Sequence, residues 1–132
     1  MGARRKGGWA RTCLSARGTP KRGDLYWIDP NPVIGREMKD RHRFVVITPE
    51  VINRVGVVIT VPVTSGGAYA RSSGLMVPIS GHETTVVAVC NQVRSFDIQA
   101  RVKVGSARFI EALDVYTAEE IVNRVLNVID PA

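Results

Sequence analysis

One run constrains the fold more than any other stretch of this chain: Val57–Gly67, which reads VVITVPVTSGG. β-Branched residues fill its first part and predict a buried strand over Val57–Val63. The run then breaks at Thr64 and Ser65, which are followed by two glycines, so two hydroxyl groups stand on a flexible backbone. Such a strand end suits contact with a phosphate group, although Ser and Thr also begin ordinary turns after strands.

The length and composition predict one domain. With 132 residues, of which 45% are hydrophobic, the chain can bury a single core but not two. No apolar run reaches the roughly 18 residues that a membrane span needs, and the N-terminus lacks the apolar core of a secretory signal. Cys13 and Cys90 stand in different contexts, and no Cys or His spacing is typical of a metal site. We therefore expect a cytoplasmic protein with no disulfide, metal or cofactor, and with Cys90 as a small buried hydrophobe.

The positive charge is concentrated at the N-terminus. Seven of the 18 basic residues and none of the 12 acidic residues lie in residues 1–22, so the rest of the chain is nearly neutral. Residues 1–21 show no apolar periodicity, and we predict a disordered basic extension there, followed by a domain over residues 22–132. The extension is either an arm that touches nucleic acid or an addition that results from the choice of start codon, and the second reading is favoured.

The body of the chain alternates short apolar runs with turns. A charged loop to about His42 follows Pro30 and Pro32, a helical turn is predicted at Glu50–Arg54, and Pro78 indicates a sheet edge or bulge. Asp97 is placed to cap a short turn. The predicted strands are Leu25–Ile28, Phe44–Thr48, Val57–Val63, Leu75–Ile79 and Thr85–Cys90, with a continuation at Arg94–Phe96 and a strand pair or a single strand within Val102–Ile110.

The C-terminus predicts an amphipathic helix. Thr117 and Glu120 match a capping box, with Thr117 as the cap. An apolar stripe follows at helical spacing, and we expect it to dock on the sheet: Ile121, Val122, Val125, Leu126 and Ile129. Short strands followed by one such helix predict a mainly β fold, namely a small, bent antiparallel sheet or barrel with a helical cover.

Five segments together resemble the MazF/PemK (Kid) family of toxin endoribonucleases, in the same order from Arg22 to about Ile129. They are Arg22–Asp24, Asp29–Glu37, Val61–Gly67, Asn91–Arg94 and Asp97–Arg101. The resemblance implies an SH3-like barrel of the CcdB/MazF/PemK type, a homodimer and a cognate antitoxin. It also implies sequence-specific, metal-independent cleavage of single-stranded RNA, with inhibition of translation and growth as the result.

A second class of function stays open beside the nuclease. The structurally related CcdB toxins poison DNA gyrase by binding, and the end of their C-terminal helix would be the contact. In this chain the helix ends in Val128–Ala132, without the aromatic ending expected of a gyrase poison. The polar residues at the strand ends match the nuclease branch instead.

The chemistry of metal-independent RNA cleavage needs a fixed cation and a hydroxyl group. The ribose 2′-hydroxyl is the nucleophile, so the protein must align it and stabilise the charge that develops on the phosphorus. The resemblance assigns these tasks to Arg43, whose guanidinium suits phosphate oxygens, and to Thr64. Phe44 stands after Arg43 where the family has Pro, and the neighbours Arg41 and His42 leave the alignment open by about one residue.

The resemblance also implies a set of RNA-contacting residues: Arg36, Glu37, Ser65, Leu75, Thr85, Asn91 and Gln92. Among them, Arg36 and Asn91, together with Val89, replace titratable or charged groups of the Kid/PemK branch, so the general acid and base stay open. His42 is the one imidazole near the predicted site, and its catalytic role is a minority alternative. Tyr69 is the aromatic residue expected to stack on an RNA base.

Overall fold

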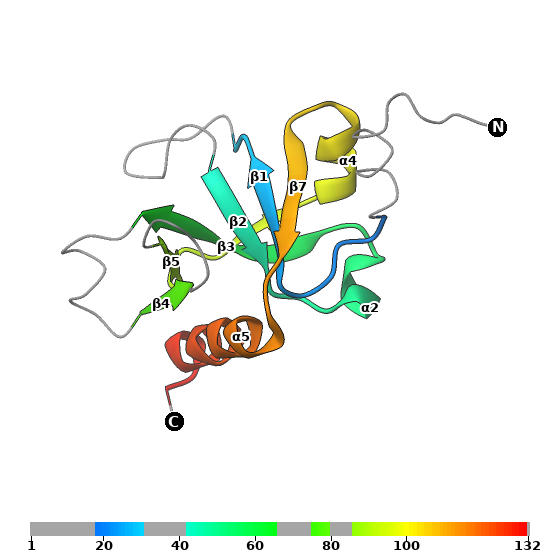
Figure 1. The fold of residues 1–132 in the computed structure, drawn as a ribbon. Coiled ribbons are helices and arrows are strands. Elements are labelled where there is room, and N and C mark those ends of the chain that lie inside the picture. Colours follow the sequence, from blue (N-terminus) through cyan, green and yellow to red (C-terminus); the bar gives the residue numbers. More distant parts are fainter. Residues whose placement is uncertain (1–17, 31–41, 66–74, 80–85, 132) are drawn as a thin grey trace.

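The computed structural model describes residues 18–30, 42–65, 75–79 and 86–131. Figure 1 shows a bent sheet with helix α5 packed below one end of it. The strands are β1 (Asp24–Ile28), β2 (His42–Val46), β3 (Val58–Ser65), β4 (Met76–Ile79), β5 (Val86–Val89), β6 (Arg94–Phe96) and β7 (Ala107–Ala112). The helices are α2 (Glu50–Asn53), α4 (Ile98–Lys103) and α5 (Val115–Ile129). The prediction of a mainly β fold with a C-terminal helix is confirmed.

Strand β3 is the centre of the sheet. The strand order is β4-β5-β3-β2-β1-β7, with β6 paired to β3 outside this path, and each of these pairings is antiparallel. On one edge of β3, β6 pairs with the first half and β5 with the last residues, from Val63 to Ser65. The predicted strand therefore continues two residues further than its apolar run, and Thr64 and Ser65 belong to the strand rather than to a turn.

Both faces of the sheet are covered. On one face, Leu25, Val45 and Val61 pack with Ile121 of α5 in a single buried cluster. The residues that alternate with them face the other way and form a second buried cluster, which includes Tyr26, Phe44, Phe96 and Ile98. Because successive strand residues point to opposite sides, runs such as Leu25–Ile28 are apolar throughout rather than alternating.

The segment Arg22–Asp24 joins the start of β1 to the end of β2 by hydrogen bonds. Gly23 has a positive φ of 91°, and a Cβ atom there would lie 3.2 Å from the Cβ of Ala118 in α5, so a larger residue would be crowded as well as strained. The Gly23 amide donates to the Val46 carbonyl oxygen (2.8 Å), and Arg22 Nε donates to the Ile47 carbonyl oxygen (2.7 Å). These bonds hold the chain entry against the end of β2.

Helix α5 begins earlier than predicted. Its N-cap is Asp114, whose carboxylate accepts from the Thr117 amide (3.0 Å) and the Thr117 hydroxyl (2.7 Å). The predicted Thr117 cap is wrong because the aspartate three residues upstream already satisfies that amide, which places Thr117 inside the first turn. The hydrogen bond from the Thr117 hydroxyl and those from backbone amides hold the pKa of Asp114 below its usual value. The Glu120 carboxylate lies 3.8 Å from the Arg124 guanidinium.

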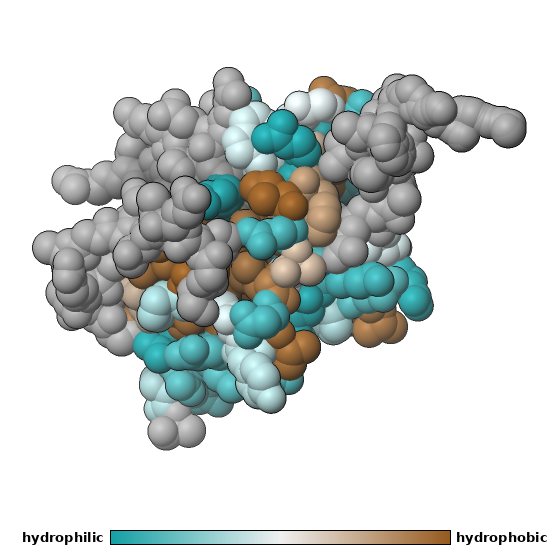
Figure 2. Space-filling model, in the orientation of Figure 1, coloured by the Kyte–Doolittle hydropathy of each residue, from teal (hydrophilic) through white to brown (hydrophobic). Residues whose placement is uncertain are grey.

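Only part of the apolar stripe of α5 is buried. Ile121 and Val125 are buried and Val122 is half-buried, whereas Leu126 is 55% exposed and Ile129 is 70% exposed. The prediction that the whole stripe docks on the sheet is therefore wrong for its last two residues. Figure 2 shows a mostly hydrophilic surface over α5 and hydrophobic atoms at the surface beside α2, where Val51, Ile52 and Val55 are exposed.

The segment after β6 differs in part from the prediction. Asp97 does cap the next element, since its carboxylate accepts from the Ala100 amide (3.1 Å), but that element is the six-residue helix α4. The strand expected within Val102–Ile110 starts only at Ala107, because α4 and its closing turn use the residues before it.

The helical turn at α2 and the edge position of Pro78 on β4 are confirmed. Within the described residues, no helix has both the length and the apolar character needed to cross a membrane.

Cys90 follows β5 and is fully buried, as predicted. Burial is the main cause that raises the pKa of its thiol to about 11, with smaller opposing effects of Arg124 and Glu120. The thiol is therefore protonated at neutral pH and serves as a core side chain. Cys13 lies outside the described residues.

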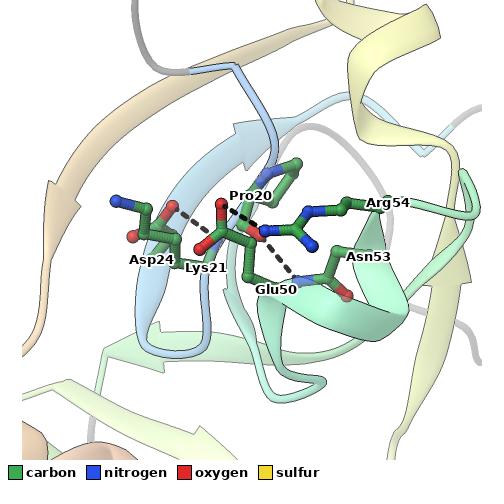
Figure 3. Close-up of polar contacts among 6 residues, drawn as sticks. All are labelled: Pro20, Lys21, Asp24, Glu50, Asn53 and Arg54. Atoms are coloured by element: carbon green, nitrogen blue, oxygen red, sulfur yellow. Dashed lines mark hydrogen bonds and ion pairs between the residues drawn. The ribbon is translucent and has the colours of Figure 1, made fainter.

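Asn53 is a buried polar residue that the sequence did not single out. Its side-chain amide donates to the carbonyl oxygens of Pro20 and Thr48, both at 2.8 Å, and its amide oxygen accepts from the Thr48 hydroxyl at 2.6 Å. Figure 3 shows Asn53 reaching Pro20 beside the exposed Glu50–Arg54 ion pair. Pro20, which the sequence assigns to the extension, is buried against the domain.

Replacing Asn53 tests this junction. Asn53→Ala leaves two carbonyl oxygens and one hydroxyl without their partner, so we expect a loss of about 2–4 kcal/mol in the free energy of unfolding, measured in urea. Arg54→Ala, on the exposed side of the same turn, is the matched control and should change stability by less than about 0.5 kcal/mol. Equal effects of the two substitutions would contradict the role given to Asn53.

Candidate active site

The two predicted catalytic residues meet at one rim of the sheet. Arg43 is the second residue of β2, and Thr64 is the last but one of β3. The strands are antiparallel, and Arg43 is paired with Val63, the neighbour of Thr64. Adjacent strands lie about 4.8 Å apart, so the pairing brings the two backbone positions close together. Both lie within one residue of a strand end, where a ligand can reach the sheet from its edge.

The pairing also separates their side chains. Directly paired residues point to the same face, and successive residues alternate. Arg43 therefore shares the face of Val63, on the side of α5, whereas Thr64 shares the opposite face with its partner Val87. The pairing of β2 with β3 extends from Val46 and Thr60 to Arg43 and Val63, and the alternative residue His42 precedes Arg43 as the first residue of β2.

Arg43 carries its charge without a partner in the part of the chain that the structure describes. No hydrogen bond or ion pair joins its guanidinium to any described residue, and its side chain is half-buried. Other arginines are engaged, for example Arg101, which donates to the Asp29 carbonyl oxygen at 2.9 Å. Thr64 is also half-buried. An unneutralised guanidinium and a strand-end hydroxyl at one rim are suited to binding a phosphate group.

Three of the predicted RNA contacts gather at a different place. Leu75 precedes β4, and its carbonyl oxygen accepts from the Cys90 amide at 2.9 Å, next to Asn91 and Gln92. Thr64 pairs with the start of β5, but these three residues lie beyond its end. The four residues of β5 span roughly 10 Å, so this group is separate from the rim of Arg43 and Thr64.

The remaining predictions fall outside this description. Arg36, Glu37, Thr85 and Tyr69 lie outside the described residues, and Ser65 is described by its backbone alone, paired with Val86. The sequence reasoning missed Trp27 and Arg108, which are paired across β1 and β7 at the same end of the sheet as Arg43. The signal was present in β7, where exposed Arg108 alternates with the more buried Ala107 and Phe109.

Comparison with known proteins identifies the family of the chain. The family described as "PemK-like, MazF-like toxin of type II toxin-antitoxin system" matches residues 21–129. The chain is 35% identical over 98 residues to the endoribonuclease PemK of Escherichia coli, covering 71% of this chain and 74% of that protein. It is 34% identical over 84 residues to the endoribonuclease toxin ChpB of E. coli K12, covering 61% and 72% respectively.

Solved structures share the fold. The crystal structure of MazF from Deinococcus radiodurans superposes with a TM-score of 0.69 at 23% identity, covering 84% of this chain and 96% of that one. A MazE-MazF structure from the same organism gives a TM-score of 0.64 at 20% identity, covering 84% and 95% respectively. The curated relatives are named as endoribonucleases, which favours the nuclease interpretation over a gyrase poison. By sequence over residues 21–129 and by fold, this chain belongs to the PemK-like, MazF-like toxin family of type II toxin-antitoxin systems.

Proposed function

We propose that this chain is a sequence-specific endoribonuclease toxin that cleaves single-stranded RNA, including mRNA, without a metal ion. The family match, with three curated relatives that are named endoribonucleases, carries the proposal. In this proposal the rim formed by β2 and β3 supplies a cation and a hydroxyl group to the reacting phosphate. Cleavage of mRNA in the cytoplasm would stop translation and growth.

The reaction can be written from the chemistry of RNA. The ribose 2′-hydroxyl loses its proton as its oxygen forms a bond to the adjacent phosphorus, the bond from phosphorus to the 5′-oxygen breaks, and the 5′-oxygen takes up a proton, so one proton leaves and one is gained. The products are a 2′,3′-cyclic phosphate and a 5′-hydroxyl. In this proposal Arg43 stabilises the negative charge on the phosphate oxygens, and Thr64 donates a hydrogen bond to the same group. Because their side chains leave opposite faces of the sheet, the phosphate sits over the rim, where both can reach it.

Two partners belong to the proposal. A cognate antitoxin would neutralise the chain, as expected of a toxin from a type II toxin-antitoxin system. A second copy would form a homodimer, since a domain of this size gains core by pairing and α5 leaves Leu126 and Ile129 exposed.

The dimer predicts a mass. Light scattering at micromolar concentration should give twice the 14.4 kDa of one chain. A value near 14.4 kDa under these conditions would rule out a stable homodimer.

The activity itself is tested with purified protein and a long single-stranded RNA. We expect cuts at a short recurring sequence, unchanged by a chelator, with 5′-hydroxyl ends at the cut sites. Primer extension maps the positions, and phosphorylation by a kinase identifies the ends. Cleavage that stops with chelator and returns with a divalent cation would contradict the proposed mechanism, and the absence of any cut would contradict the function.

The catalytic pair is tested by substitution. Arg43→Ala should slow cleavage by about 10²- to 10³-fold, since one preorganised donor is lost, and Arg43→Lys should recover little because an ammonium lacks the two-pronged contact. Thr64→Val keeps the branched shape and removes the hydroxyl, so it should be slower than Thr64→Ser. Single-turnover cleavage rates give these comparisons, with Arg54→Ala as a control on a remote, exposed arginine.

The alternative at His42 defines the result that would contradict this assignment. If His42→Ala abolishes cleavage while Arg43→Ala cleaves at the wild-type rate, the catalytic role belongs to His42 and not to Arg43. Unchanged rates in both Arg43→Ala and Thr64→Val would place the site elsewhere.

A further inference from the structure

Three residues on adjacent strands form a row at one end of the sheet. Trp27 of β1 is paired with Arg43 of β2 on one side and with Arg108 of β7 on the other. Directly paired residues share a face, so the indole lies between the two arginines. Two strand spacings separate the arginine positions, roughly 10 Å. We call these residues the Trp27 row.

The row lies on an accessible part of the sheet. Its face is the one that α5 covers, but Trp27 is near the end of β1, Arg43 near the start of β2 and Arg108 near the start of β7. Figure 1 shows these strand ends pointing away from α5. Arg108 is exposed, and Trp27 and Arg43 are half-buried. The Arg108 guanidinium carbon lies 5.3 Å from the centroid of the Trp27 ring, so the cation covers the indole.

The charge of the row is not neutralised within the described residues. Among the described residues, the Arg108 guanidinium makes only the ring contact, and the Arg43 guanidinium makes no hydrogen bond or ion pair. The carboxylates that these three strands carry, Asp24 and Glu111, are at the opposite strand ends, near α5. By contrast, Arg54 lies 3.9 Å from the Glu50 carboxylate. Asp29 follows the end of β1, but the structure shows no ion pair between a carboxylate of the described residues and either Arg43 or Arg108. The row therefore presents two cations and one aromatic ring.

This combination matches the chemistry of unpaired nucleotides. A single strand exposes bases, which stack on aromatic rings and on guanidinium planes, together with phosphates, which bind cations. A duplex hides its bases and offers only the phosphates. Arg43 also lies close to Thr64 at the rim, so single-stranded RNA bound to the row would pass the proposed cleavage site.

We propose that the Trp27 row is a binding subsite for single-stranded RNA. The stacked pair of Trp27 and Arg108 holds one unpaired base, and Arg43 holds a phosphate next to it. The proposal rests on the proposed function for the identity of the ligand. It assigns the base contact to a sheet residue in addition to the loop residue Tyr69 that the sequence favours.

The binding test uses RNA that cannot be cut. A 2′-O-methyl oligonucleotide lacks the nucleophile, so affinity is measured separately from catalysis. The chain has two tryptophans, Trp9 and Trp27, and Trp9→Phe makes Trp27 the only indole signal. In that background, we expect the single-stranded oligonucleotide to quench the fluorescence of Trp27, whereas a duplex of the same sequence should leave it nearly unchanged.

Variants separate the base contact from the charge. Trp27→Ala should weaken binding of the single strand by roughly 5- to 100-fold, measured by fluorescence anisotropy of a labelled oligonucleotide, and Trp27→Phe should lose less. Arg43→Gln should reduce the dependence of log K on log salt by about 0.7, the value for one phosphate contact on a single strand. Arg54→Gln removes the same charge far from the row and should change neither quantity. Circular dichroism checks that each variant is folded.

The outcomes distinguish this proposal from the proposed function. Wild-type affinity in folded Trp27→Ala, or equal quenching by single-stranded and duplex oligonucleotides, would overturn the subsite even if the protein cleaves RNA. A Trp27→Phe variant that becomes monomeric would overturn it too, because the row would then be a subunit contact. Quenching together with weaker binding in Trp27→Ala would support the subsite even if no RNA were cut.

Discussion

The pairing of β3 with three other strands is the constraint on which the rest of the structure depends. Along one edge β3 pairs with β2, and along the other it pairs first with β6 and then with β5. A strand shared in this way is covered on both faces. Val58, Val61 and Val63 are all buried, and the buried Thr60 donates its hydroxyl to the Arg94 carbonyl oxygen at 2.9 Å. Only its last two residues, Thr64 and Ser65, are polar at the rim. The position of the candidate site follows from where this strand stops being core.

The same pairing determines what the rim can do. The β2–β3 register brings Arg43 and Thr64 together at the ends of their strands, but their side chains point to opposite faces of the sheet. A substrate that contacts both side chains has to lie across the ends of these strands rather than on either face of the sheet. On the face of Arg43, the register continues through Trp27 to Arg108, so the cation proposed for catalysis is also the end of a basic and aromatic row. Catalysis and the binding of single-stranded RNA would then share Arg43.

Much of the fold could be predicted because β-branched runs and turn residues are local signals. Each predicted strand has a counterpart, and the edge position of β4 follows from Pro78. The cap of α5 was missed because Asp114 lies before the apolar stripe, and the exposure of Leu126 depends on where the sheet ends under the helix. Asn53 was missed because its partners, Pro20 and Thr48, meet only in the folded chain.

The site was predictable in composition but not in arrangement. The resemblance to the toxin family indicated Arg43 and Thr64, but the face on which each side chain lies depends on register, which a single sequence does not contain. For the same reason Leu75, Asn91 and Gln92 could be chosen as RNA contacts without showing that they gather beyond the far end of β5. In the sequence Trp27 is one more residue of an apolar strand, and only the pairing of β1 with β2 and β7 places it between two arginines.

Mapping a bound RNA on the backbone amides tests the central claim most directly. In a nuclear magnetic resonance titration with an uncleavable single strand, the account predicts the largest shift changes at the β2–β3 rim, around Arg43 and Thr64, and at the indole N–H of Trp27. Changes confined to other surfaces, such as α2 or the turn at Asn91, with none at the rim, would contradict it.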